Sequence, residues 1–593
     1  MKHRIFHPGP GPAAIIRSSC GELWRFSGLE EIIRADRTSD VLDSLYQACT
    51  CVEEKGFYAA GFISYEAAPG FDSCLEVQPD DSGFPLIWFG LFSGIQKLDH
   101  FQAEAGHLPQ DQVWAPSISP EDYAGKLAVI KEHIRNGNTY QVNFTYRLQA
   151  GFSSDPWQTF TALYAAQNPP FAAFIDTGDF AVCSLSPELF FSLNGSVLQS
   201  SPMKGTISRG LWPDQDMEMA HSLRSSEKDR AENVMIVDMV RNDMGRIAAP
   251  GSVQVPELFT VERYQDVWQM TSLVQAETTA PVERIFQALF PPASITGAPK
   301  IMTMKIISDL ESCPRRVYTG SVGYISPGRQ ARFNVAIRTL LVDKCRGLAE
   351  YGVGGGIVWD SGTDSEMDES RIKAKVLNSR KETFELLESM LWNPVQGFPF
   401  LHLHLRRLKN SADYFGFPLD MDLVQERLDR LVQSLPPAAH KIRLLISPSG
   451  AFKEEAIVLT PESFRFSALP LADMAVDPED KFLYHKTTRR NIYEQALKTR
   501  PGYKDVLLYN IRGEVTESTI ANIVIEKDGE LLTPAVHCGL LPGVFRTWLL
   551  EKGRIREETL GIDEVLASSC VYLINAVRGM HQVSIVLTNQ HRS

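Results

Sequence analysis

Long apolar runs and an excess of positive charge are both missing from this 593-residue sequence. No uninterrupted apolar stretch approaches the roughly 20 residues that a membrane-spanning helix needs. The formal net charge is −13, whereas proteins that bind nucleic acid or membrane surfaces generally present a basic field. We therefore expect neither a membrane-spanning protein nor a general nucleic-acid binder, and an anionic substrate would need a local basic or metal site.

Cysteine pairs with metal-binding or redox spacing are also missing. The nine cysteines are odd in number and scattered, and none forms a C-x-x-C pair. Such a set is typical of reduced thiols in the cytosol rather than of a disulfide framework or a zinc site. Residues 1–10 lack the apolar core of a secretory signal, so we expect a cytoplasmic protein.

Core-forming residues, by contrast, are plentiful, at 44% hydrophobic and 22% charged residues. The length exceeds what one hydrophobic core supports and suggests three or four structural domains, arranged as two functional halves. Near residue 381 the pattern of helices and strands starts again. We therefore predict a first domain over 1–380 and a second over 381–593.

Periodicity and capping signals predict the main helices and strands. Ser119 before Pro120 is typical of an N-cap. The predicted helices cover 120–135, 227–240, 370–390 and 403–415. The predicted strands of the first half include 141–148, 171–175, 189–193, 317–325, 331–342 and 351–358.

A polar segment, Ser201–Arg209, holds a lysine between a proline and a glycine. Pro202 has a fixed φ and Gly205 can adopt strained angles, so Lys204 would be held in a tight turn. Nearby, Glu188 follows Ser186-Pro187 at the mouth of a predicted strand, where burial would raise its pKa and allow general-acid chemistry. The ordinary interpretations are a solvated lysine and a strand-edge glutamate on the surface.

Acidic residues on two separated stretches offer oxygen ligands for Mg²⁺, namely Glu232 in the first and Glu366 with Glu369 in the second. They would otherwise be two solvated acidic faces. The glycine-rich run 351–357 would bring backbone N–H groups to an anion, or would form a flexible hairpin. Arg338, within an apolar predicted strand, needs an anionic partner, either a structural carboxylate or a substrate.

Together these motifs resemble the chorismate-utilising enzymes over residues 55–378. The motifs that carry the resemblance occur in the family's order and lie at 137–143, 186–188, 202–206, 229–233, 294–300 and 351–369. The resemblance implies an α/β (α+β) layered fold with two large antiparallel sheets and helices outside them.

Two positions discriminate among members of that family. Gln141 stands where isochorismate and salicylate synthases have a lysine, and Lys204 stands where anthranilate synthases have an alanine. The first half is therefore similar to aminodeoxychorismate synthase component I, which residues 62–68 also support. An anthranilate synthase-like first half is the alternative, and Lys204 argues against it.

The resemblance implies a role for each matching residue. Lys204 would attack C2 of chorismate while Glu188 protonates the departing C4 hydroxyl, and ammonia would then add at C4 and expel the lysine. Mg²⁺ held by Glu232, Glu366 and Glu369 would bind the ring carboxylate. The implied substrate-binding residues are Gln141, Thr206, Gln269, Thr296, Gly297, Ala298, Tyr324, Arg338, Gly354 and Gly356.

Two further features of the first half concern Gln269 and the source of ammonia. Gln269 stands where many relatives have histidine, so it can bind a substrate oxygen but cannot shuttle a proton. The sequence shows no glutaminase signature with a nucleophilic cysteine. The ammonia would therefore come from a separate glutamine amidotransferase subunit or from solution.

Residues 384–593 contain a second series of motifs, at 404–408, 484–489, 514–523 and 540–546. Each has an ordinary interpretation as a charged face or a loop. In this order they resemble the class IV aminotransferase and aminodeoxychorismate lyase family, a two-domain α/β fold (fold-type IV) that binds pyridoxal 5′-phosphate (PLP) in a cleft.

That resemblance implies that Lys486 forms the Schiff base with PLP and that Glu517 pairs with the protonated pyridine nitrogen. The other implied cofactor-binding residues are Arg407, Asn522, Val544, Phe545, Asn575 and Ala576. The match is more specific for the cofactor than for the reaction, because transaminases share the same core.

The two resemblances together predict a bifunctional enzyme that makes 4-aminobenzoate from chorismate and ammonia for folate synthesis. The alternatives for the second half are a D-amino acid or branched-chain transaminase and a silent structural module. A homodimer through the second domain is compatible with the resemblance.

Overall fold

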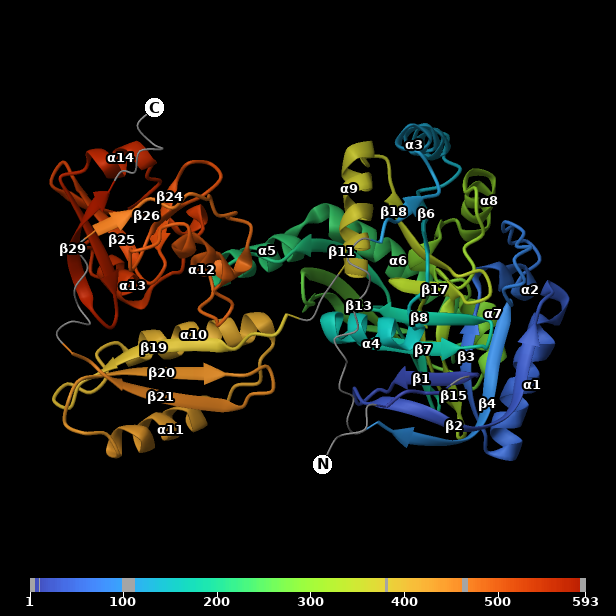
Figure 1. The fold of residues 1–593 in the computed structure, drawn as a ribbon. Coiled ribbons are helices and arrows are strands. Elements are labelled where there is room, and N and C mark those ends of the chain that lie inside the picture. The colour runs from blue at the N-terminus through green and yellow to red at the C-terminus, as the bar shows by residue number, and fades with distance from the viewer. Residues whose placement is uncertain (1–5, 10, 99–111, 379–381, 461–467, 587–593) are drawn as a thin grey trace. The chain divides into compact units, whose positions relative to one another are not determined.

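The structure is a computed structural model that describes residues 6–9, 11–98, 112–378, 382–460 and 468–586. The chain divides into two compact units (Figure 1). The first consists of Met1–Ser208 and Ala220–Glu382, and the second of Arg209–Met219 and Thr383–Ser593. A short segment from the middle of the sequence's first half thus belongs to the second unit.

The first unit is built on eighteen strands, all paired antiparallel in one continuous network. Their bounds are β1 (Ala13–Arg17), β2 (Leu23–Ala35), β3 (Tyr58–Ile63), β4 (Ile87–Lys97), β5 (Ala115–Pro116), β6 (Gln141–Gly151), β7 (Phe171–Asp176), β8 (Phe180–Ser186), β9 (Leu189–Asn194), β10 (Val197–Ser201), β11 (Met203–Ser208), β12 (Gln254–Arg263), β13 (Val267–Glu277), β14 (Gly297–Ala298), β15 (Ser321–Ser326), β16 (Gln330–Val335), β17 (Thr339–Asp343) and β18 (Leu348–Ile357).

The network has two arms that meet at β1, which pairs with β2 on one side and with β7 on the other. One arm runs β2-β4-β3-β15-β16-β9-β10-β13, with β11 and β12 also on β13. The other runs β7-β8-β17-β18-β6, with β5 and β14 on β6. The resemblance predicted two large antiparallel sheets, and these arms are that pair.

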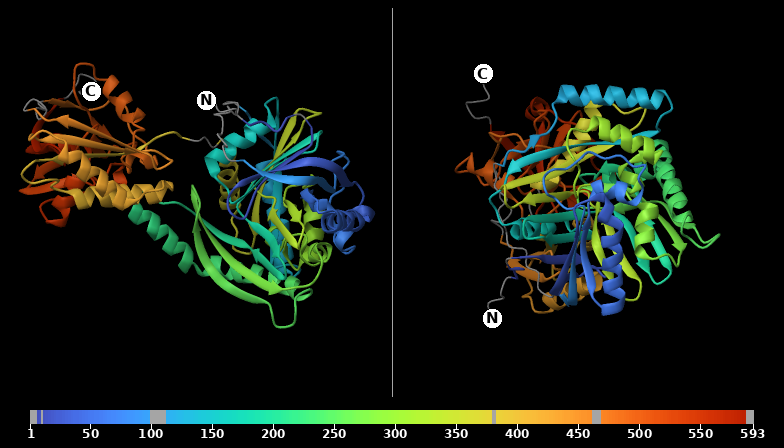
Figure 2. Two further views of the ribbon diagram at one scale, coloured as in Figure 1. Left: turned by 90° about the horizontal axis from the view of Figure 1, so that it is seen from below. Right: turned by 90° about the vertical axis from the view of Figure 1, so that its right-hand side faces the viewer.

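The arms face each other across an inner core, and helices cover their outer faces (Figures 1 and 2). Strand β1 shows the alternation that produces these layers. Ala14 and Ile16 enter the inner core, whereas Ile15 packs outward against Trp157 and Phe160. The described helices that begin before residue 380 are α1 (Val41–Lys55), α2 (Ala68–Phe71), α3 (Pro120–Arg135), α4 (Pro156–Gln167), α5 (Pro213–Ser225), α6 (Glu227–Gly245), α7 (Val282–Leu289), α8 (Lys300–Leu310) and α9 (Thr363–Ala374).

Local signals located two helices well, and a third prediction failed. The predicted cap of α3 is present, since the Ser119 hydroxyl accepts a hydrogen bond from the backbone N–H of Asp122 at 3.0 Å, and α6 begins at the predicted residue. The helix predicted over 370–390 is wrong, because α9 ends at Ala374 and Leu386–Trp392 is a strand. Pairing with a neighbouring strand overrides the local pattern there.

The strand predicted over 331–342 is also interrupted. The structure has two strands, β16 and β17, separated at 336–338. Arg338 has a φ of 49° in this break, which no regular strand residue adopts. The polypeptide therefore changes direction at the arginine that the sequence singled out.

The second unit contains a three-stranded antiparallel sheet and a larger mixed sheet. The strands are β19 (Leu386–Trp392), β20 (His440–Ile446), β21 (Phe452–Val458), β22 (Ala468–Pro470), β23 (Leu507–Tyr509), β24 (Val515–Ser518), β25 (Asn522–Lys527), β26 (Glu530–Pro534), β27 (Arg556–Glu558), β28 (Cys570–Asn575) and β29 (Gly579–Val586). The helices are α10 (Leu401–Phe415), α11 (Met421–Gln433), α12 (Asn491–Lys498), α13 (Val544–Glu551) and α14 (Ile562–Ala567).

Each sheet of the second unit has its own core. Side chains of α10 and α11 pack with β19 and β20 around Leu386, Ile442 and Leu428. In the mixed sheet, β22 and β29 pair in parallel, whereas β28, β25, β24 and β23 are joined by antiparallel pairs. This two-domain α/β arrangement agrees with the fold expected for the second half.

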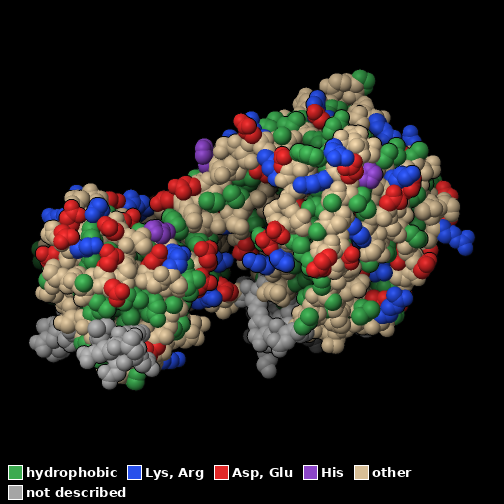
Figure 3. Space-filling model, turned by 90° about the horizontal axis from the view of Figure 1, so that it is seen from above, with side chains coloured by type: hydrophobic (Ala, Val, Ile, Leu, Met, Phe, Trp, Pro, Cys, Tyr) green, Lys and Arg blue, Asp and Glu red, His purple; other side chains and the backbone are tan. Residues whose placement is uncertain are grey.

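Within the described ranges, no helix combines the length and the apolar character required to cross a bilayer. On the face drawn in Figure 3, acidic and basic side chains are interspersed rather than separated into fields of one sign.

A buried arginine ties together the segments that later prove to form the first site. Arg315 is 1% exposed, and it donates hydrogen bonds to the carbonyl oxygens of Asn143 at 2.7 Å and Ile295 at 3.0 Å. Its charge is balanced by Glu311, which accepts two hydrogen bonds at 2.6 and 2.9 Å. Bidentate, charge-assisted bonds of this kind are strong and directional. We call this group the Arg315 clamp.

Replacing Arg315 by methionine should lower the free energy of unfolding of the first unit by about 3–5 kcal/mol, because the buried Glu311 would lose its bidentate partner and keep only the more distant Arg147, at 3.7 Å. Urea unfolding measures this loss. In the matched control, Arg241→Met, the lost partner is the exposed Asp238, and we expect a loss below about 1 kcal/mol. Equal losses in the two variants would contradict a stabilising role for the clamp.

Candidate active sites

Lysine 204, Gln141 and Gly356 converge in the first unit. Strand β6 carries Gln141 and pairs with β18, which places Asn143 opposite Gly356. A Cβ atom added to Gly356 would lie 2.6 Å from both the Lys204 Nζ and the Gln141 Nε2. A side chain at this position would force the amine or the amide to move, so glycine lets both groups lie over this strand.

The Gln141 side chain is fully buried, yet neither its oxygen nor its nitrogen has a hydrogen-bond partner among the described residues. Buried polar groups without partners are costly. A polar ligand beside the Lys204 amine would remove that cost.

Lysine 204 lies on a strand rather than in the predicted tight turn. Residues 203–208 form β11, and the pairing of β11 with β13 shifts between Met203 and Thr206, which marks a bulge. Gly205 in this bulge has a φ of 93°, and an added Cβ would approach Asp229 to 3.0 Å. The prediction of strained backbone at Gly205 is confirmed, but its setting is a bulged strand.

Burial lowers the pKa of Lys204, and the positive charge of Lys373 adds to this effect, while Glu232 opposes it. A lowered pKa favours the neutral amine, which is the nucleophilic form. Lys204 is only partly exposed, and its Nζ lies over Gly356 beside Gln141, which argues against a solvated surface lysine.

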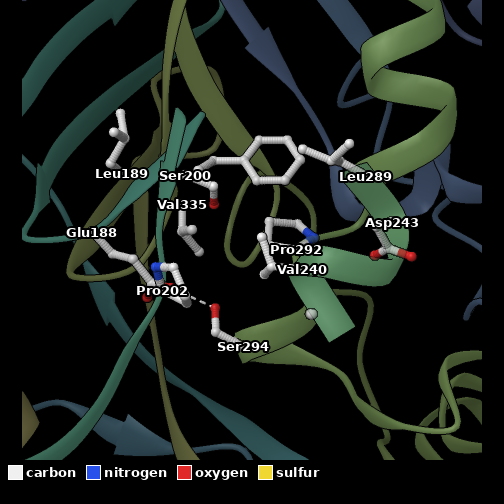
Figure 4. Close-up of a pocket in the computed structure, with 12 residues that line it drawn as sticks. Glu188, Leu189, Ser200, Pro202, Val240, Asp243, Leu289, Pro292, Ser294 and Val335 are labelled. Carbon is white, nitrogen blue, oxygen red and sulfur yellow. Dashed lines mark hydrogen bonds between the residues drawn. The ribbon is translucent and has the colours of Figure 1, made fainter. Parts of the chain in front are cut away.

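Glutamate 188 lies between β8 and β9 and is only 4% exposed. Burial raises its pKa to about 7, and the Ser294 hydroxyl donates a hydrogen bond of 2.6 Å to its carboxyl. Figure 4 shows Glu188 and Ser294 facing each other beside a small cavity with apolar walls that include Val240 and Leu289. The environment suits a carboxyl that is still protonated near neutral pH.

Serine 294 was not among the predicted site residues, although its position inside the 294–300 motif was a usable signal. Its hydrogen bond is one of the interactions that lower the pKa of Glu188. It therefore acts against burial and tunes the acid.

The acidic residues Glu232, Glu366 and Glu369 lie on α6 and α9. Burial raises the pKa of Glu232 and of Glu366, and the charge of Glu369 contributes to both effects. Glu369 itself pairs with Lys373 at 2.7 Å. In the described part of the chain no three carboxylate, thiol or imidazole groups converge into a ready metal site.

The chemistry of these three carboxylates nevertheless fits Mg²⁺, which prefers carboxylate oxygens and keeps several waters. The negative charge of Glu369 raises the pKa of both Glu232 and Glu366, and a bound cation would reduce this repulsion. Mg²⁺ would compete with the Lys373 ammonium group for Glu369, one of its three proposed ligands.

Tyrosine 324 lies elsewhere than predicted. Its ring is in the inner core, 5.7 Å from the ring of Trp24 and 5.9 Å from that of Phe26. The tyrosine that contacts the glycine strand is Tyr318, since a Cβ atom added to Gly352 would meet its ring at 2.2 Å. The prediction chose the wrong one of two tyrosines six positions apart, because strand alternation sends Tyr324 to the inner core.

Arginine 338 has no carboxylate within ion-pair distance among the residues that the structure describes. Its charge acts on the nearby Tyr264 and Tyr351, whose pKa values burial raises and Arg338 lowers. Of the two partners that the sequence left open, a structural carboxylate is thus not found. An anionic ligand remains.

The other predicted substrate-binding residues lie on or next to strands that pair with those carrying Lys204 and Gln141. Gln269 pairs with Thr206 across β13 and β11, and its Nε2 donates to the Thr206 hydroxyl at 3.4 Å. Thr296 precedes β14, where Gly297 has a φ of 144° and Ala298 pairs with Gln141. Gly354, with a φ of 159°, lies opposite Thr145 on β18. The Arg315 clamp holds the carbonyls of Asn143 and Ile295 beside these segments.

The second unit contains a cavity of about 320 Å³ around Lys486. Predicted cofactor-binding residues that line it are Arg407, Lys486, Glu517, Asn522, Val544, Asn575 and Ala576. Burial and the charge of Arg407 lower the pKa of Lys486 to about 7. Such an amine is neutral in a large fraction of molecules near pH 7, as imine formation requires.

Glutamate 517 is buried and held by three donors. They are the Tyr493 hydroxyl at 2.9 Å, the Asn522 amide at 3.1 Å and the Leu541 backbone N–H at 3.2 Å. Burial raises the pKa of Glu517 to about 7, which the bond from Tyr493 partly offsets. The sequence did not single out Tyr493, whose hydroxyl is brought to Glu517 by α12.

At the other end of the cavity, Arg407 on α10 faces the first turn of α13. The N–H groups of Val544 and Phe545 lie in this turn, where backbone donors favour an anion. Arg407 is held by Glu388 through bonds of 2.7 and 2.8 Å, and His404 also contacts Glu388 at 2.7 Å. These two supporting residues were not predicted.

The cavity fits PLP on the chemistry of its walls. It has an amine of lowered pKa, a buried carboxyl for a ring nitrogen, and an arginine beside a helix N-terminus for a phosphate. Gly543, at the Arg407 end of the cavity, leaves room for the Asn522 side chain, because an added Cβ would lie 2.0 Å from it.

Comparisons with known proteins cover both halves. Residues 9–379 match the family model of the chorismate binding enzymes, and residues 385–586 match that of the class IV amino-transferases. Aminodeoxychorismate synthase component 1 of Klebsiella aerogenes is 43% identical over 337 residues, and that of Escherichia coli (strain K12) is 35% identical over 337 residues. Each match covers 53% of this chain and 74% of the relative.

Among solved structures, anthranilate synthase component I from Streptococcus pneumoniae TIGR4 aligns with a TM-score of 0.53 at 24% identity. The alignment covers 64% of this chain and 94% of that chain. At this level of identity the likeness concerns the fold of the first half.

If Glu232 is a ligand of Mg²⁺, Glu232→Gln should weaken Mg²⁺ binding at least about tenfold, since an amide lacks the charge of the carboxylate. Isothermal titration calorimetry with MgCl₂ measures the dissociation constant. Asp238→Asn, an exposed change on the same helix, is the matched control and should leave it unchanged. Equal dissociation constants for wild type and Glu232→Gln would contradict the assignment.

Proposed function

The chain belongs to the chorismate binding enzyme family, and from this premise we propose that it makes 4-aminobenzoate from chorismate and ammonia for folate biosynthesis. One observation carries the proposal. Each half places an amine of lowered pKa, Lys204 or Lys486, beside a buried carboxyl whose pKa is raised to about 7. The similarity to aminodeoxychorismate synthase component 1 and the class IV amino-transferase match support the two steps.

In the first step, the Lys204 nitrogen forms a bond to C2 of chorismate and both ring double bonds shift toward C4. The C4–oxygen bond breaks, and Glu188 donates the proton with which the hydroxyl leaves as water. Ammonia then attacks C4, both double bonds shift back, and the C2–nitrogen bond breaks with its electron pair returning to Lys204. The product is 4-amino-4-deoxychorismate.

Charge on the substrate is matched by residues around this centre. Arg338 has no carboxylate within ion-pair distance among the described residues, and the N–H groups of Gly354 and Gly356 lie on strand β18. Glu232, Glu366 and Glu369 would hold Mg²⁺, which supplies positive charge for the ring carboxylate. The buried Gln141 amide, which has no partner among the described residues, would form a hydrogen bond with a polar group of the substrate.

In the second step, Lys486 takes the proton from C4 and the C3–oxygen bond breaks, so that the ring becomes aromatic. The enolpyruvate that leaves takes up a proton and becomes pyruvate. PLP, when bound, supplies the electron sink that stabilises the charge left on C4. Glu517 would keep the pyridine nitrogen protonated. Arg407 and the first turn of α13 would hold the phosphate.

The partners and the location follow from the same proposal. Relatives named component 1 imply a second component, which we propose is a glutamine amidotransferase that supplies ammonia. A homodimer through the second half also stays a proposal. The nine cysteines are all free thiols, which supports a reducing, cytoplasmic location.

Product identification tests the two steps separately. With chorismate, Mg²⁺ and an ammonium salt, wild type should yield 4-aminobenzoate and pyruvate. Lys486→Ala should accumulate 4-amino-4-deoxychorismate, which added lyase converts to 4-aminobenzoate. Lys204→Ala should form neither product at a significant rate, because it lacks the nucleophile.

Four outcomes would contradict this assignment. Anthranilate from wild type would identify a tryptophan-branch enzyme, and unchanged amination in Lys204→Ala would refute the covalent role. Accumulation of the intermediate by wild type would refute the lyase step, and turnover of an amino acid with 2-oxoglutarate would favour a transaminase.

The pH profile of amination should have a descending limb near pH 7. Glu188 acts in its protonated form, and because burial raises its pKa to about 7, that form is present below pH 7 and lost above it. At a constant concentration of neutral ammonia, kcat/KM for chorismate should fall about tenfold per pH unit above this limb.

Ser294→Ala provides the matched variant. The Ser294 hydrogen bond lowers the pKa of Glu188, so its removal should move the descending limb to higher pH. A limb that stays in place would assign it to another group.

A further inference from the structure

The second unit is completed by eleven residues from the sequence's first half. Arg209–Met219, here called the inserted segment, belongs to the second unit although it directly follows β11. Arg209 lies five residues after Lys204, at the end of the motif that carries the first site's amine. Its side chain nevertheless packs within the second unit, which contains the cavity around Lys486.

The inserted segment has a shape set by its own buried ion pair. Arg209 donates hydrogen bonds to both Asp216 carboxylate oxygens, each at 2.6 Å, and the Gly210 N–H donates to the same carboxylate at 3.0 Å. The two side chains are 4% and 9% exposed. Gly210 is required for this closure, because an added Cβ would lie 2.2 Å from the backbone nitrogen of Asp216.

Arginine 209 also holds the C-terminal end of α10. Its guanidinium lies 4.3 Å from the centre of the Tyr414 ring, and it donates a hydrogen bond of 3.4 Å to the Tyr414 carbonyl oxygen. Carbonyls in the last turn of a helix lack partners within the helix, and a positive charge there is stabilising. Helix α10 is the element that carries Arg407.

The same contacts reach the residue before Lys486. The Tyr414 ring lies 4.3 Å from the ring of His485, which also contacts the Ser411 hydroxyl at 3.0 Å. The Trp212 ring lies 5.1 Å from that of Tyr484. The Lys486 carbonyl, for its part, accepts a hydrogen bond from Leu387 at 2.9 Å. The inserted segment thus supports Tyr484 and His485 on one side, while β19 holds Lys486 on the other.

We propose that Arg209 is a positioning residue for the cofactor site of the second unit. It fixes the end of α10, and with it Arg407 at the phosphate end of the cavity. Through Tyr414 and His485 it also fixes the backbone that presents Lys486. The inference rests on PLP as the cofactor of the proposed function, but not on the reaction that PLP serves.

The test uses the full chain and compares three variants with wild type. Arg209→Gln removes the charge. Arg209→Met combined with Asp216→Leu removes the pair and leaves no unpaired buried charge, so that the fold is retained. The control is Arg427→Met with Glu454→Leu, which removes an ion pair between α11 and β21 in the same unit.

Two quantities are measured by absorbance. One is the dissociation constant of PLP from the apoprotein, and the other is the pH at which the lysine-bound cofactor changes its spectrum. Both Arg209 variants should raise the dissociation constant at least about fivefold and shift the pH midpoint, whereas the control should leave both at the wild-type values. Amination measured with added lyase should stay at the wild-type rate in all variants.

Wild-type values of both quantities in Arg209→Gln or in the double variant would overturn the proposal, even if the thermal midpoint fell, because the residue would then be merely structural. Failure of wild type to bind PLP would instead overturn the cofactor assignment, so the two failures are distinguishable.

Discussion

The first site depends on one buried guanidinium. Arg315 donates to the carbonyls of Asn143 and Ile295, which lie in segments far apart in the sequence, while Glu311 neutralises its charge. These segments supply Gln141 from β6 and Ser294 from the loop before β14. Since a carbonyl needs a donor and a buried arginine needs acceptors, the clamp satisfies both, whereas the Gln141 side chain is among the buried polar groups that have no partner in the described residues. The Gln141 amide is therefore available to bind a ligand, and it lies beside the Lys204 amine.

Both halves use the same physical device for different chemistry. Burial lowers the pKa of each lysine and raises that of its neighbouring carboxyl, because a low-dielectric environment disfavours either charged form. The supporting partners differ. Glu188 has Ser294, whereas Glu517 is held by Tyr493, Asn522 and Leu541, as suits a carboxyl that must keep one orientation. In addition, Arg209 of the inserted segment follows Lys204 by five positions in the sequence, and we propose that it supports the backbone at Lys486 in the second unit.

Local sequence signals predicted structure best where the signal itself is local. The Ser119 cap and the start of α6 were found because capping is decided within one helical turn. The helix predicted over 370–390 and the unbroken strand over 331–342 failed because long-range pairing decides both. The tight turn at Lys204 failed for the same reason, since pairing with β13 makes it a bulged strand.

The sequence by itself determined the family, the two lysines and their order along the chain, because motif composition and spacing survive without knowledge of packing. Only the tertiary structure decided the environment of these residues. It placed Tyr318 rather than Tyr324 against the glycine strand, gave Glu188 a serine partner, and left Arg338 without a structural carboxylate in the described residues. It also assigned Arg209–Met219 to the second unit. Burial and partner choice arise from contacts between residues distant in sequence, and no local pattern encodes them.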